Sequence, residues 1–240
     1  MSITHNVLIP LELPDPDPIP SVLVDTLASM EVVVLGHYGL PEQTPPSAGR
    51  NQFETKANTE LDGLAQPLAE AGASVTTRLV FGKARDKTID RVAVEEDCDV
   101  ILTPGQAKTV ERIVVPMRGA ENLDRITSFV GELLSATDAS VTLFHTSESS
   151  DRLPGEELLA AATDRLVETG VAPDRINQQL SEDEDVERSI VELGEDFDLL
   201  VLGETEPSLR DRIFGTVPAQ VTADTEDPAF VVRDIDAPES

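Results

Sequence analysis

The feature that most constrains the fold of this 240-residue chain is an internal repeat. Four short segments of the first half recur in the same order in the second half. Residues 7–10 match 113–116, 31–37 match 139–145, 68–72 match 166–170, and 98–102 match 197–201. Repeats in one order at a near-constant offset indicate two copies of one structural unit. The sequence therefore predicts two tandem domains, residues 1–108 and 109–240.

Each copy alternates short β-branched runs with longer helical patterns. In the second copy, strands are expected at 112–117, 140–145, 175–180, 199–202 and 229–233. Helices are expected from Leu123, from Pro154 to a C-cap at Gly170, and over 186–197. Strands that alternate with helices predict an α/β fold, with a doubly wound, Rossmann-like parallel sheet in each domain. Ligands of such sheets bind at the carboxyl ends of strands, so a site is expected after Pro116 and Leu202.

The charge balance excludes several classes of partner. The chain has 46 Asp and Glu against 18 Lys and Arg, a formal net charge of −28. Such a surface repels phosphate backbones and anionic lipids, so no nucleic-acid partner and no membrane-surface binding are expected. The sequence shows no apolar run of membrane-spanning length and no signal peptide, which predicts a cytoplasmic protein without membrane insertion. Because the acidic residues are spread along the whole chain, we interpret them as adaptation to a salt-rich, halophilic cytoplasm.

Familiar catalytic and metal-binding motifs are absent from the sequence. It contains no Walker motif, GxGxxG, HExxH or paired cysteines, and the single Cys98 excludes an internal disulfide. His5, His37 and His145 are far apart in sequence. His37 and His145 occupy equivalent positions in the two copies, which favours a structural role. We therefore expect no catalytic residues, no metal site and no enzymatic activity.

One stretch of the second copy has the composition of an anion-binding loop. It runs from Gly203, which follows an apolar strand, to Gly215, Thr216 and Pro218. Glycines allow close backbone approach to phosphate oxygens, and Thr216 is placed as the N-cap of a short helix, where unpaired N–H groups favour an anion. An ordinary strand-to-helix loop closed by two glycines fits the same pattern.

The strand ending in Pro116, the βαβαβα order, the strand that ends at Gly203 and the late Gly215–Thr216 pair resemble the universal stress protein family. The whole chain resembles its tandem two-domain form. The resemblance implies an adenine nucleotide alpha hydrolase-like fold whose domains pair through their last strands, as a pseudo-dimer or homodimer. It also implies ATP as a cofactor, held by a G-x2-G-x9-G-(S/T) loop. The implied binding residues are Pro116, Gly203, Gly215 and Thr216.

The chain departs from the family pattern at several of these positions. Glu206 stands at the middle glycine, and the loop is one residue short. The acidic residue expected after the first strand is absent, with Arg118 in that turn; Arg118, Arg210 and Arg212 could offer guanidinium groups to an anion. In the first copy, the equivalent turn holds five prolines together with the acidic residues Glu12, Asp15 and Asp17. We therefore expect no nucleotide site in the first domain.

Two functions remain open at the level of sequence. The first is a regulatory protein of the universal stress type with at most one ATP or anion site, in the second domain. The alternative is a module without nucleotide that acts by contact, as a dimeric scaffold or as a cytosolic regulator of a partner protein such as a transporter. An adenylating ligase fits poorly, because the Ser-Gly-Gly-type pyrophosphate loop is missing after the first strand.

Overall fold

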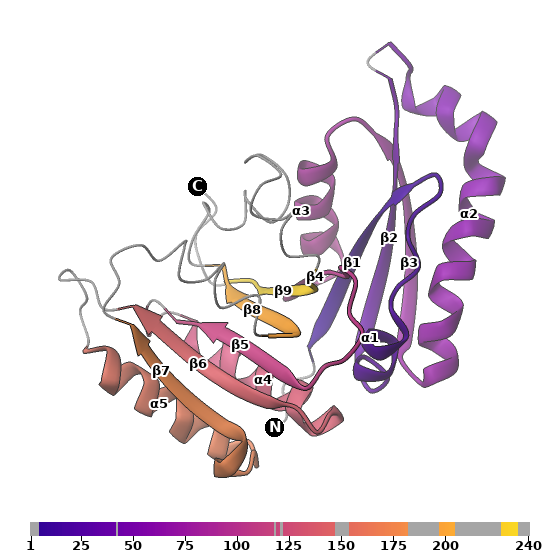
Figure 1. Cartoon of the computed structure of the whole chain (residues 1–240). Helices are drawn as coiled ribbons and strands as arrows, with labels where there is room; N and C mark the ends of the chain where they lie inside the picture. The colour runs from indigo at the N-terminus through magenta and orange to yellow at the C-terminus, as the bar shows by residue number, and fades with distance from the viewer. Residues whose placement is uncertain are drawn as a thin grey trace. The chain divides into compact units, whose positions relative to one another are not determined.

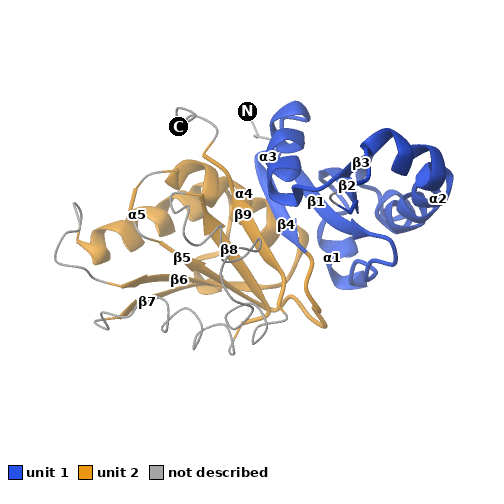
Figure 2. Ribbon diagram, turned by 90° about the horizontal axis from the view of Figure 1, so that it is seen from above, with its two compact units in different colours: residues 1–103 blue, residues 104–240 orange. Residues whose placement is uncertain are grey.

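A computed structural model of the chain describes residues 5–41, 43–117, 119–120, 122–146, 154–181, 197–204 and 227–234. The chain divides into two compact units, Met1–Thr103 (unit 1) and Pro104–Ser240 (unit 2), shown in Figure 2. The boundary falls a few residues before the one expected at residue 108. Each unit is described by itself below.

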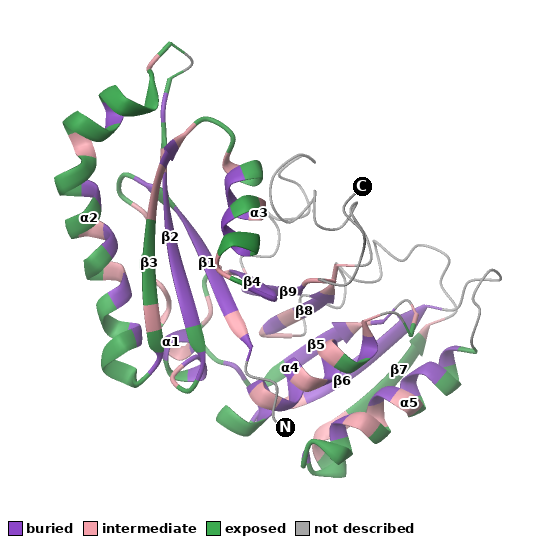
Figure 3. Cartoon of the chain, turned by 180° about the vertical axis from the view of Figure 1, so that it is seen from behind, coloured by how far each residue is buried: buried purple, intermediate pink, exposed green. Residues whose placement is uncertain are grey.

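Unit 1 contributes four parallel strands in the order β3-β2-β1-β4. Its strands are β1 (Asn6–Leu13), β2 (Glu31–Gly39), β3 (Ser74–Gly82) and β4 (Val100–Thr103). Its helices are α1 (Ser21–Thr26), α2 (Pro46–Ala71) and α3 (Arg85–Glu95). Helices α2 and α3 lie on opposite sides of this sheet (Figure 3). Strands covered on both faces explain the continuous apolar run Val32–Leu35, which is buried throughout.

Tight packing inside unit 1 fixes which face of β2 meets which helix. A side chain on Gly36 would collide with Leu13 and with Leu61 of α2, at 2.8 and 3.2 Å. Because successive strand residues point to opposite faces, the next residue, His37, faces the other side of the sheet. The long helix α2 ends at Gly72, whose φ of 118° is a left-handed conformation that favours glycine.

Unit 2 contributes five parallel strands in the order β9-β8-β5-β6-β7 (Figure 1). Its strands are β5 (Arg112–Pro116), β6 (Ser140–Thr146), β7 (Ile176–Ser181), β8 (Leu199–Gly203) and β9 (Ala229–Val232). Its described helices are α4 (Leu123–Ala136), α5 (Gly155–Glu168) and the 3-10 turn Pro173–Arg175. Helices α4 and α5 contact each other and pack on the sheet.

The structure confirms the α/β fold with parallel sheets that the sequence predicts. The strands expected at 112–117, 140–145, 175–180, 199–202 and 229–233 are all present, with ends shifted by a residue or two. The helix that begins after Pro154 is present, and Gly170 follows it with a positive φ. The helix expected over 186–197 falls almost entirely outside the described residues. Within the described ranges, none of the helices combines the length and apolar character that crossing a membrane requires.

Candidate functional site

The candidate site lies at the carboxyl ends of β5 and β8 in unit 2. These two strands are parallel neighbours, with Ile113 opposite Leu199 and Val114 opposite Leu200. From β5 the chain proceeds to β6 and β7 on one side of the sheet, and it returns to β8 and β9 on the other. This is the topological switch point at which doubly wound sheets bind ligands. Pro116 and Gly203 end the two strands at this edge, and both are partly exposed.

The structure thus brings together two of the four site residues that the sequence predicts, Pro116 and Gly203. The other two, Gly215 and Thr216, lie outside the described residues. Four further residues also lie outside the described residues: Arg118, Glu206, Arg210 and Arg212. The anion-binding role of the arginines and the repulsive effect of Glu206 therefore remain predictions.

The turn after Pro116 is held by a buried histidine. Nδ1 of His145 donates to the carbonyl oxygen of Met117 at 2.6 Å, and the N–H of Met117 donates to the carbonyl of Phe144 at 2.7 Å. His145 is buried, and Gly155, the first residue of α5, leaves room for its ring. A side chain on Gly155 would lie 2.4 Å from Cδ2 of His145. His145 therefore positions the turn, which is a structural role.

A carboxylate stands directly beside the first glycine of the expected loop. Glu204 follows Gly203, and its side chain is only 15% exposed. Its Oε2 accepts the N–H of Asp234 at 3.0 Å and lies 3.8 Å from Nε of Arg233. Burial raises the pKa of Glu204 and the Asp234 carboxylate adds to the rise, while Arg233 and the Asp234 N–H oppose it. The guanidinium of Arg233 and the carboxylate of Glu204, the residue that follows Gly203, therefore lie close together.

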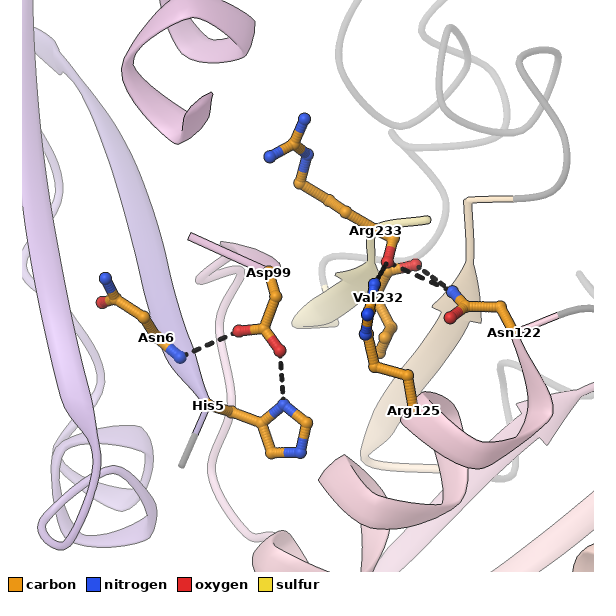
Figure 4. A network of polar contacts seen from close by, with 7 residues as sticks. All are labelled: His5, Asn6, Asp99, Asn122, Arg125, Val232 and Arg233. Carbon is orange, nitrogen blue, oxygen red and sulfur yellow. Dashed lines mark hydrogen bonds and ion pairs between the residues drawn. The ribbon is translucent and has the colours of Figure 1, made fainter. Parts of the chain in front are cut away.

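The turn between β5 and α4 is fixed to the end of β9 by a side-chain amide. Nδ2 of Asn122 donates to the carbonyl oxygens of Val232 and Arg233 at 3.3 and 3.2 Å, and Nη1 of Arg125 donates to the Arg233 carbonyl at 3.2 Å (Figure 4). Asn122 adopts a left-handed conformation, with φ of 58°, just before α4 begins. These contacts place both sides of the switch point in one hydrogen-bonded network.

Sequence reasoning missed Asn122, Glu204 and Arg233. An asparagine directly before the amphipathic pattern that starts at Leu123 is a pattern typical of a helix start, so Asn122 could have been found. The contact between Glu204 and Arg233 joins residues 29 positions apart, so the periodicity of the local sequence does not predict it.

The described side chains at this edge include groups that bind anions. Arg125 and Arg233 meet at the end of β9, where Arg125 donates to the Arg233 carbonyl and the Arg233 guanidinium faces Glu204. Guanidinium groups recognise phosphate and carboxylate oxygens. Within the residues that the structure describes, no cluster of three His, Cys, Asp or Glu side chains could hold a metal ion.

Comparison with known proteins identifies the fold. No protein-family profile and no curated protein sequence match the chain. Among solved structures, a universal stress protein of Archaeoglobus fulgidus DSM 4304 superposes with a TM-score of 0.63 at 15% identity, over 94% of this chain and 96% of that one. A protein of Pseudomonas aeruginosa UCBPP-PA14 assigned to the universal stress proteins gives 0.51 at 16% identity, over 97% and 94%.

A third similar structure is part of a membrane transporter. The cytoplasmic domain of a prokaryotic cation chloride cotransporter superposes with a TM-score of 0.50 at 10% identity, over 95% of both chains. At these identities the likeness concerns the fold alone. The chain therefore has the fold of the universal stress proteins along nearly its whole length.

Proposed function

We propose that this protein is a non-catalytic regulatory protein of the universal stress type, with one site for an adenine nucleotide or another anion in unit 2. The observation that carries the proposal is the position of Pro116 and Gly203, which end neighbouring parallel strands at the switch point. The guanidinium groups of Arg125 and Arg233 lie near the end of β9, where Arg233 also faces the Glu204 carboxylate. Ligand sites of doubly wound sheets are built from these elements.

ATP is the ligand that the family resemblance favours. In such a complex Pro116 would flank the base, and Gly203 would approach the ribose or the phosphates. Gly215 and Thr216 would hold a phosphate through backbone N–H groups and the hydroxyl.

Unit 1 is proposed to lack a nucleotide site at its own first turn. The N–H of Asp15, directly after β1, donates to Oε1 of Glu60 from α2 at 2.7 Å. The Asp15 N–H, which could otherwise face an anion, is therefore already hydrogen-bonded to the Glu60 carboxylate. Pairing of two units or two chains through their terminal strands, as a pseudo-dimer or homodimer, remains a prediction from the sequence.

The second candidate function is a contact module without a nucleotide. Glu204 supports it, because a carboxylate beside Gly203 repels phosphate oxygens. Such a module would act as a dimeric scaffold or as a regulator of a partner protein. The fold shared with a cotransporter's cytoplasmic domain supports a transporter as one partner of this kind.

A thermal-shift experiment with ATP and Mg²⁺ separates the two candidates. It compares the native protein with Glu204→Gln, which keeps the size of the side chain and removes its charge. Glu168→Gln, at an exposed position of α5, is the matched control for net charge. If the site binds ATP, the native protein is stabilised saturably, and Glu204→Gln binds about fivefold more tightly, as expected for about 1 kcal/mol of screened repulsion.

Stabilisation of Glu204→Gln alone, with no effect on the native protein, would reject nucleotide binding and favour the contact module. Equal tightening in Glu168→Gln would show that net charge, rather than the carboxylate beside Gly203, controls affinity.

A further inference from the structure

The turn between β3 and α3 in unit 1 concentrates positive charge in an acidic protein. Lys83, Arg85 and Lys87 stand within five residues and include two of the four lysines of the chain. They surround the start of α3, whose N-cap residue Ala84 makes no side-chain capping hydrogen bond. The N-terminus of a helix carries partial positive charge and first-turn N–H groups without an intrahelical partner. Asp86 is the one carboxylate among these five residues, so the turn keeps an excess of positive charge.

A buried histidine lies against the same turn. His37, near the end of β2, is only 2% exposed, and neither ring nitrogen has a hydrogen-bond partner among the described residues. A methyl group on Gly82 would lie 3.7 Å from Nε2 of His37 and 3.8 Å from Oγ1 of Thr88. Gly82 ends β3 and Thr88 lies in the first turn of α3, so Nε2 is directed at this turn.

A buried imidazole whose two ring nitrogens have no hydrogen-bond partner among the described residues is a candidate ligand contact. Buried polar groups are almost always hydrogen-bonded, and leaving one unpaired is costly. The equivalent residue of unit 2, His145, does have a partner, the carbonyl of Met117. The backbone hydrogen bond that compensates burial of His145 in unit 2 therefore has no counterpart for His37 among the described residues of unit 1.

Arg85 adds a second polar group of the same kind. Its Nε is buried and has no hydrogen-bond partner within the described part of the chain, and its Nη1 lies 4.0 Å from the carboxylate of Asp86. The side chain is 29% exposed, so the guanidinium is open on one side to solvent. The guanidinium influences His37 electrostatically, as do the carboxylates of Glu12 and Asp86.

We propose that His37, Arg85 and the first-turn N–H groups of α3 bind a small oxyanion, a phosphate group, in unit 1. Nε2 of neutral His37 donates one hydrogen bond, the guanidinium of Arg85 donates others, and the helix start supplies N–H groups and a favourable dipole. Lys83 and Lys87 raise the local potential. The donors of this site come from β2 and from the turn between β3 and α3, while Glu12 of β1 is the strand neighbour of His37.

The protonation state of His37 provides a direct readout. Burial lowers the pKa of His37 and Arg85 lowers it further, while Glu12 and Asp86 raise it. A bound phosphate would add negative charge beside the ring and would therefore raise this pKa.

NMR on the full chain tests the proposal with inorganic phosphate as the probe, at fixed ionic strength. The chain has three histidines, and His37→Gln assigns the His37 resonance. Phosphate is expected to shift the His37 ring signals saturably and to raise the pH at which they titrate. Arg85→Gln should weaken binding about tenfold, as for loss of one charge-assisted hydrogen bond. Arg91→Gln, on the same helix and paired with Glu95, is the matched control and should bind like the native protein.

Absence of a saturable His37 shift would overturn the proposal, as would equal weakening by Arg85→Gln and Arg91→Gln, which would indicate diffuse attraction. Thermal melts of each variant establish that it is folded. A parallel titration with a phosphomonoester, glycerol phosphate, distinguishes a site for free phosphate from one for a phosphorylated metabolite. Tighter binding of the ester would assign the latter, and equal or weaker binding the former.

Discussion

The most deeply buried ion pair among the described residues joins His5 to Asp99 in unit 1. Nδ1 of His5 donates to the Asp99 carboxylate at 2.6 Å, and the N–H of Asn6 donates to the same carboxylate at 2.9 Å (Figure 4). Burial by itself would raise the pKa of Asp99. The hydrogen bonds from His5 and Asn6, together with the charge of His5, outweigh burial and hold that pKa below its usual value.

A depressed pKa makes Asp99 a source of stability that depends on pH. The contribution is present above the unfolded-state pKa, about 3.9, and is lost as pH falls through the lower folded-state value. We expect Asp99→Ala to cost about 3 kcal/mol near neutral pH, because it leaves a buried imidazole without its partner. Denaturant unfolding from about pH 6 to pH 3 should show a shallower acid loss in the variant. An unchanged pH slope would contradict this role.

A second residue-scale prediction concerns Gly155, the glycine against His145. A side chain there would also lie 2.7 Å from Cδ1 of Leu180, and the His145 ring is fixed by its bond to Met117. We expect Gly155→Ala to cost about 1–3 kcal/mol by overpacking. Gly63→Ala is the control, since nothing lies within 4 Å of a side chain at that position in α2. It should stabilise by about 0.5–1 kcal/mol. Thermal unfolding measures both variants. Equal changes in the free energy of unfolding for Gly155→Ala and Gly63→Ala would refute the packing argument.

At the scale of elements, the start of α4 depends on Asn122. Its amide joins this helix to the end of β9, and its backbone adopts the left-handed conformation. We expect Asn122→Gly to cost about 1–2 kcal/mol through the lost hydrogen bonds. Asn122→Ala should cost about 1 kcal/mol more, because alanine disfavours that conformation.

The matched control for Asn122 is Asp97, which has a φ of 53° after α3. Asp97→Gly should be neutral or slightly stabilising, since glycine relieves the same conformation. Denaturant unfolding measures all three variants. A loss in Asp97→Gly as large as that in Asn122→Gly would show that backbone entropy, rather than the amide bridge, sets the cost.

Most elements of this fold could be predicted from the sequence, and most contacts of the site could not. Strands such as Leu199–Gly203 are continuous apolar runs, and α5 carries Leu158, Ala162 and Leu166 on one face, so periodicity identifies them. The bond from Asn122 to Val232 joins residues 110 positions apart. Such contacts depend on which strands become neighbours in the sheet, and local pattern does not contain that information.

At the scale of the whole molecule, the net charge of −28 dominates the electrostatic energy of the folded chain. Several surface arginines pair with nearby carboxylates, as Arg91 does with Glu95 and Arg112 with Asp198. Exposed pairs of this kind contribute little to stability. The unpaired excess of carboxylates should therefore destabilise the folded chain through self-repulsion in dilute buffer.

Salt should relieve this repulsion. At about 1 M KCl the Debye length is about 3 Å, so distant carboxylates no longer repel each other. We expect the Tm to rise by about 2–4 °C for each kcal/mol of repulsion relieved. Sucrose, which stabilises without screening charge, is the control. Equal stability in dilute buffer and in concentrated KCl would contradict the halophilic interpretation of the composition.

The central proposal is a nucleotide site at the ends of β5 and β8. Calorimetric titration of the full chain with ATP and Mg²⁺ in KCl tests it most directly. The account predicts saturable binding of one ATP per chain, abolished by Gly203→Val, whose β-branched side chain suits a strand but obstructs this edge. Gly63→Ala should bind normally. Absence of binding, or binding unaffected by Gly203→Val, would contradict the account.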